Sequence, residues 1–88
     1  MPTLEVIARV RELHSELSET QPDAPHLVEE HQELARAVDA VMLDPKQVHL
    51  YTSLNDRLLL AYVKFELDHP KLAAAMQNVM SSLAAAGI

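Results

Sequence analysis

At 88 residues the chain has the length of one domain, and its 13 acidic and 7 basic residues give a net charge of −6. It contains no cysteine, which excludes disulfides, thiolate metal ligands and cysteine nucleophiles, and favours a reducing compartment such as the cytoplasm. The acidic balance, with only one Phe and two Tyr available for base stacking, disfavours nucleic acid as a partner.

The first apolar stretch predicts an amphipathic helix. Its apolar residues recur at three- and four-residue spacing from Val6 to Leu17, and Thr3 is suited to cap the start of this helix. Charged residues such as Glu5 and Arg9 interrupt the stretch, so we expect no signal peptide.

A second helix is expected from about Pro25 to Leu43, after a loop at residues 21–25 in which two prolines prevent helical continuation. Glu29 and Glu33 fall on its polar side. Its apolar stripe comprises Leu27, His31, Leu34, Ala35, Val38, Val41 and Met42.

The third helix is expected to begin close to residue 44. Asp44 is suited to the N-cap position and Pro45 to the first helical position, although a start near Thr52 is the alternative. This helix has two apolar stripes on nearly opposite sides, and two stripes require two partners. The main stripe comprises Tyr51, Leu54, Leu58, Ala61, Tyr62 and Phe65, and the second comprises Leu60, Val63 and Leu67.

A fourth helix follows the break at residues 68–70 and carries no charged residue after Lys71. The uncharged segment is too short and too polar to span a bilayer, so we expect no membrane partner. Gly87 is suited to the position after the helix end, with Ile88 folding back as an apolar contact. Leu72, Met76, Val79, Met80 and Leu83 are expected to point inward, and Ala74, Ser81 and Ala85 form a back face of small residues.

These elements predict an all-α fold, an antiparallel four-helix bundle in which residues 1–88 form a single helical domain. The bundle either closes within one chain or is completed by a partner chain. Because one core cannot cover both stripes of the third helix, we expect a homodimer. Its expected interface residues are Leu60, Val63, Leu67, Ala74, Ser81 and Ala85.

The C-terminal third resembles a small bacterial family known as domain-of-unknown-function family 4404. The resemblance implies a helical fold and a bacterial source, and it assigns no catalytic residue. It is carried by Phe65, Glu66, His69, Pro70, Leu72, Gly87 and Ile88.

Glu66 and His69 form an E-x-x-H spacing, which di-metal helical bundles use for metal ligands. Pro70 weakens that interpretation, because it moves His69 out of helical geometry; the alternative is that Glu66 and His69 serve the helix end and the next helix start. His14 and His31 lie on apolar stripes, where a hydrogen-bonded histidine at the core edge is commoner than a ligand or base.

No nucleophile motif or glycine-rich phosphate loop is visible, so we expect no enzyme activity and no cofactor. The sequence favours a non-catalytic, self-associating interaction or scaffold module. The alternative is a helical bundle that binds a metal or small ligand through Glu66 and His69. An unidentified protein partner remains open, and Met42, Met76 and Met80 are either core filler or an adaptable partner groove.

Overall fold

The computed structural model describes residues 3–88, and these residues contain four α-helices and no strand. The helices are α1 (Leu4–Glu19), α2 (Pro25–Leu43), α3 (Val48–Phe65) and α4 (Pro70–Ala85). The all-α prediction and the expected breaks at residues 21–25 and 68–70 are therefore confirmed.

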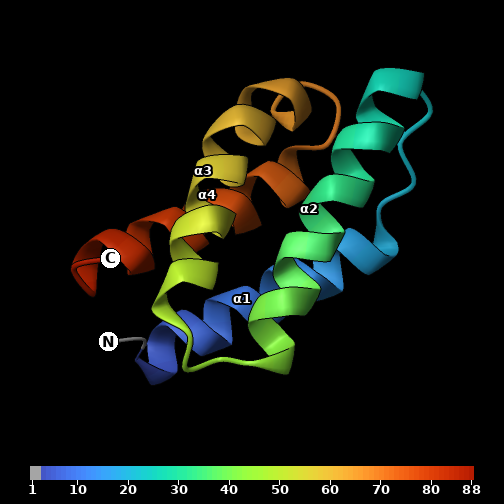
Figure 1. Ribbon diagram of the computed structural model, residues 1–88. Coiled ribbons are helices and arrows are strands. Elements are labelled where there is room, and N and C mark those ends of the chain that lie inside the picture. Colours follow the sequence, from blue (N-terminus) through green and yellow to red (C-terminus); the bar gives the residue numbers. More distant parts are fainter. Residues whose placement is uncertain (1–2) are drawn as a thin grey trace.

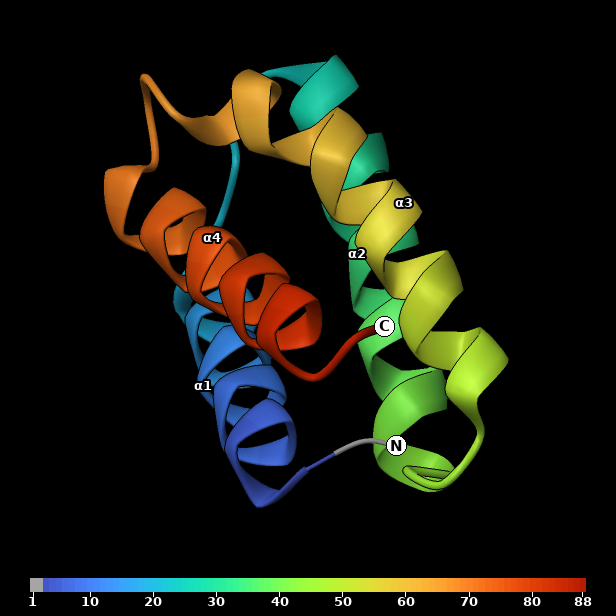
Figure 2. The same cartoon turned by 90° about the vertical axis from the view of Figure 1, so that its left-hand side faces the viewer.

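The four helices form two layers. Figure 1 shows α2 and α3 side by side in front, with α1 and α4 behind them, and Figure 2 shows the same two pairs from the side. Contacts join α1 to α2, α2 to α3, α3 to α4 and α4 back to α1. Each helix therefore has two neighbours, and the core is closed within the chain by a ring of helix contacts.

The core is built from one apolar stripe of each helix. On α3 the main stripe is confirmed, since Tyr51 and Phe65 at its two ends are fully buried. Burying a side chain of this size contributes about 1.5–3 kcal/mol. Tyr62 and Met80, both expected inward, are only half-buried and pack against the core edge.

Both predicted helix ends near the termini are confirmed. Thr3 caps α1, because its side-chain oxygen accepts a hydrogen bond of 3.2 Å from the backbone N–H of Val6. At the other end Gly87 has a φ of 77°, and the N–H of Ile88 donates to the carbonyl of Leu83 at 2.9 Å. This is the glycine-terminated helix end that folds Ile88 back onto the core.

The expected start of α3 is wrong. Asp44 belongs to the end of α2, since its N–H donates to the carbonyl of Ala40, and Gln47 is the residue that precedes α3. Asp44 and Gln47 close a turn through a 3.2 Å backbone hydrogen bond, with Pro45 inside it. The hydroxyl of Tyr51 donates to the carbonyl of Pro45 at 2.6 Å, which ties this turn to the core.

The predicted faces of α2 also need correction at two positions. Met42 was expected inward but is 40% exposed, and Glu30, which lies outside the expected stripe, is only 8% exposed. Burial of Glu30 depends on a partner from α3, because an ionised carboxylate is costly to bury without one.

Candidate interaction surface

The outward face of α3 and the turn after it carry large apolar side chains that the fold leaves uncovered. Leu60, Val63 and Leu67 are 60%, 72% and 89% exposed. They are spaced three and four residues apart, which places Leu60 and Val63 on one side of the helix, and Leu67 continues that side just past the helix end at Phe65. The second stripe therefore lies opposite the core and covers nothing within residues 3–88.

Leu59 belongs to the same surface, although it was not among the expected interface residues. Its side chain is also exposed, and it precedes Val63 by four positions. That spacing is the signal that identifies it as a neighbour of Val63 on the helix surface. We call Leu59, Leu60, Val63 and Leu67 the outer α3 patch.

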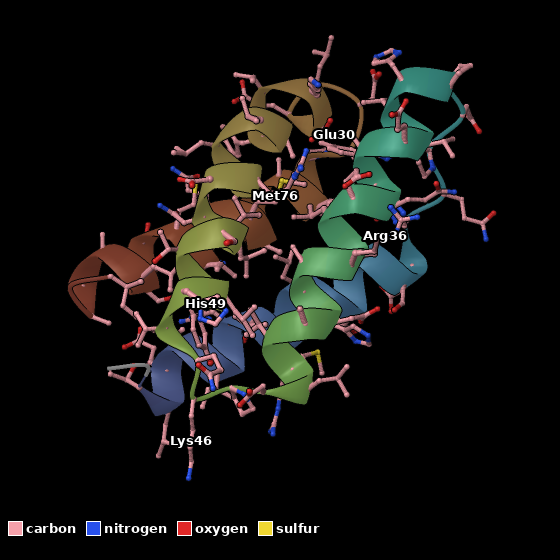
Figure 3. The ribbon with its side chains drawn as sticks, in the orientation of Figure 1. Glu30, Arg36, Lys46, His49 and Met76 are labelled. Carbon is pink, nitrogen blue, oxygen red and sulfur yellow. The ribbon has the colours of Figure 1, made fainter. Side chains whose placement is uncertain are left out.

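An ion-pair cluster borders the outer α3 patch on the side of α2. Lys64 Nζ donates to Glu30 Oε2 at 3.1 Å, and Arg57 lies 3.8 Å from a carboxylate oxygen of both Glu30 and Glu33. Figure 3 shows Glu30 on α2 pointing toward α3. Leu60 lies between Arg57 and Lys64 in the sequence, so charges that hold α3 against α2 flank the patch.

Glu30 is the residue of this cluster with the least access to water. Its Oε1 is buried and has no hydrogen-bond partner within residues 3–88. The cluster lines an open polar groove together with His26 and Glu29. Sequence reasoning missed Glu30 because its partner Lys64 is 34 residues away in the chain.

The predicted α4 residues Ala74, Ser81 and Ala85 are exposed. The small residues Ala75 and Ser82 are instead buried. The Ser82 hydroxyl donates a hydrogen bond of 2.9 Å to the carbonyl of Val79. Ala74 lines a groove with residues of α1, whereas the outer α3 patch is bordered by α2. The predicted residues on α3 and α4 thus lie on different flanks of the molecule.

Glu66 and His69 occupy the turn between α3 and α4. Glu66 is the exposed residue that ends α3, and His69 directly precedes α4 with a non-helical backbone. The N–H of His69 donates to the carbonyl of Phe65 at 2.8 Å, and the two rings are 5.7 Å apart. Across residues 3–88, no group of three or more His, Asp and Glu side chains is placed to hold a metal ion.

The other two candidate histidines join α1 to α2. His31 Nε2 lies 2.7 Å from the carbonyl of Leu17, close to the end of α1. His14 Nε2 lies 3.7 Å from a carboxylate oxygen of Asp39, and these side chains are 44% and 60% exposed. His31 is therefore the core-edge histidine with one hydrogen bond that the sequence pattern favoured.

Comparison with known families supports the resemblance seen at the C-terminus. The model of the family described as "Domain of unknown function (DUF4404)" matches residues 6–88. The chain belongs to this family. Because the DUF4404 match begins in the first turns of α1 and ends at Ile88, it takes in all four helices and the outer α3 patch. No curated protein and no solved structure matches the chain.

Within residues 3–88, none of the four helices combines the length and the apolar character that crossing a bilayer requires.

Proposed function

We propose that this DUF4404 protein is a non-catalytic interaction module that self-associates through the outer α3 patch. Each copy in this proposal is an antiparallel four-helix bundle, and two copies pair about a two-fold axis. The observation that carries the proposal is the exposure of Leu60, Val63 and Leu67 beside a core that is already complete.

Burial energetics favour a partner for this surface. Covering a side chain of this size is worth about 1.5–3 kcal/mol, and four such side chains together form the apolar centre that a specific interface needs. A dimer of this kind is expected to bury on the order of 1,200–2,000 Å² in total. Ala74, Ser81 and Ala85, which the sequence assigned to the same interface, lie on another flank and are not part of this proposal.

A second copy of the chain is the simplest partner for the outer α3 patch, because it requires no other protein. In a two-fold interface the same patch is used twice, so the patch must be self-complementary. The patch is apolar, and apolar surfaces meet that condition because they carry no like charges to oppose each other. Lys64 and Arg57 at its edge are already balanced by Glu30 and Glu33 of the same chain.

Sedimentation equilibrium tests the proposal directly. We expect the mass of a dimer at micromolar concentration, against 9.8 kDa for one chain. A protein that remains monomeric at several hundred micromolar would contradict the proposal, since specific dimers of this size bind more tightly than that.

Single-cysteine variants locate the axis, because the chain has no cysteine of its own. Val63 lies midway between Leu60 and Leu67, so in a two-fold pair of α3 helices it lies nearest its own copy. Val63→Cys should therefore form an intermolecular disulfide under mild oxidation, which needs the two Cα atoms within about 7 Å. Gln32→Cys, on the exposed side of α2, is the matched control and should crosslink slowly.

A further inference from the structure

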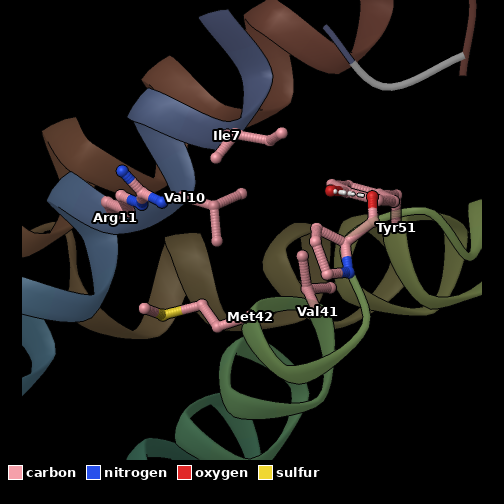
Figure 4. A pocket seen from close by; sticks show the side chains of 7 residues that line it. Ile7, Val10, Arg11, Val41, Met42 and Tyr51 are labelled. Atoms are coloured by element: carbon pink, nitrogen blue, oxygen red, sulfur yellow. Dashed lines mark hydrogen bonds between the residues drawn. The ribbon is translucent and has the colours of Figure 1, made fainter. Parts of the chain in front are cut away.

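A small cavity lies where α1, the end of α2 and the turn before α3 meet (Figure 4). Its volume is about 70 Å³, a little over two liquid-water volumes. Its one lining residue on α3 is Tyr51, in the first turn, whereas the outer α3 patch begins at Leu59, further along that helix. Its apolar wall consists of Ile7, Val10, Val41, Met42, Pro45 and Tyr51.

Apart from Arg11, the wall offers few groups that could hydrogen-bond a polar molecule. The hydroxyl of Tyr51 is the natural donor, but it is already bound to the carbonyl of Pro45 at 2.6 Å, as Figure 4 shows. Apolar pockets of this kind accept small apolar groups. The volume fits a branched end of three or four carbons, which is smaller than the aromatic ligands of larger engineered cavities.

Arg11 is the one charged residue in the cavity wall. Its side chain is exposed, and within residues 3–88 no carboxylate lies close enough to form an ion pair with it. By contrast, the other three arginines, Arg9, Arg36 and Arg57, all have acidic partners. A guanidinium at the edge of an apolar cavity is complementary to a carboxylate on an apolar ligand.

Met42 gives the cavity an adjustable side. It is 40% exposed and lines the cavity instead of filling the core. An unbranched thioether side chain changes rotamer at little cost, so it can move to admit a ligand.

We infer that this cavity binds a short, branched aliphatic carboxylate, with the branched end among Val10, Val41 and Met42 and the carboxylate against Arg11. This site is independent of the proposed dimer, because none of its lining residues belongs to the outer α3 patch.

Isovalerate is the probe for a test by two-dimensional ¹H–¹⁵N NMR on the whole chain. We expect saturable shifts confined to amides near residues 7–11 and 41–51, with a dissociation constant on the order of 1–10 mM for so small a ligand. Arg11→Gln should weaken binding about fivefold, as one exposed charge pair would. Isovaleramide, which has the same shape without the charge, should bind wild type and Arg11→Gln equally.

Two controls separate this site from general surface binding. Arg36→Gln removes another exposed arginine and should leave isovalerate affinity unchanged. Ile7→Phe should fill the cavity and abolish the shifts while the protein stays folded by circular dichroism. Shifts that do not saturate, or that persist unchanged in Arg11→Gln, would overturn the carboxylate site, and the dimer mass would be unaffected by either result.

Discussion

The two faces of α3 carry the same kinds of side chain and have opposite environments. The inner face, with Tyr51 and Phe65 at its two ends, is buried between α3 and its neighbours α2 and α4, whereas the outer α3 patch is exposed. Since the ring of helix contacts closes without the outer patch, the fold does not account for its apolar character. Apolar spacing on a helix therefore identifies surfaces that need covering, and only the tertiary contacts distinguish a core from an interface.

The largest effect is expected on the inner face. Phe65→Ala should lower the free energy of unfolding by about 3–5 kcal/mol, because it removes a fully buried ring and leaves a cavity. Urea denaturation followed by circular dichroism measures the loss. Leu60→Ala, measured at a protein concentration too low for association, is the matched control and should cost less than about 0.5 kcal/mol. Similar losses for the two variants would contradict the assignment of Phe65 to the core and Leu60 to the surface.

The next effect concerns the outer face. Val63→Lys combined with Leu67→Lys should abolish self-association, because two added charges per copy would have to be desolvated in the interface. Each monomer should stay helical, since both positions are exposed in the single chain. Sedimentation and circular dichroism measure these two outcomes.

Gln21→Lys combined with Gln32→Lys adds the same charge at exposed positions away from α3, and should leave association intact. If both double variants dissociate alike, added charge alone explains the effect and the outer α3 patch is not the interface.

The helix breaks and the inner faces could be predicted from the sequence because they depend on local information. Prolines at positions 22, 25, 45 and 70 fix the breaks, and three-four spacing fixes which residues share a face. The prediction for the start of α3 was wrong because local information was not enough there. Asp44 is as suitable for a helix end as for a start, and the choice depends on the contact from Tyr51 to Pro45.

The surfaces were predictable only in part. The outer stripe was found from spacing, but the burial of Glu30 requires Lys64 from the neighbouring helix. The cavity beside Arg11 arises where three elements meet, and nothing in the order of residues brings Ile7 next to Met42. Such features depend on long-range packing and have no local signature.

A smaller effect is expected at the boundary between the two faces, where Lys64 meets Glu30. Lys64→Met should destabilise the fold by about 1–2 kcal/mol, because it leaves the nearly buried carboxylate of Glu30 with only the more distant Arg57. Arg36→Met breaks the exposed pair with Glu33 and should cost less than about 0.5 kcal/mol. Chemical denaturation of both variants measures the difference, and equal losses would mean that Glu30 is effectively solvated.

The smallest effect is on pH dependence and involves the two tyrosines of α3, of which Tyr51 is fully buried and Tyr62 is half-buried at the core edge. Burial raises the pKa of Tyr51 above its ordinary value of 10.0, and burial together with the nearby Glu66 carboxylate raises the pKa of Tyr62. A raised pKa means that the folded state holds the proton more tightly than the unfolded state. The resulting stabilisation is fully present below pH 10.0 and is lost as the pH rises through the folded-state values. No change in stability is therefore expected near neutral pH.

Tyrosinate absorbance during alkaline titration measures both groups, and Tyr51→Phe leaves Tyr62 as the only tyrosine that titrates. Native protein that forms half of its tyrosinate at the pKa of a free tyrosine would show that one of the two rings is solvated, and the variant would identify which.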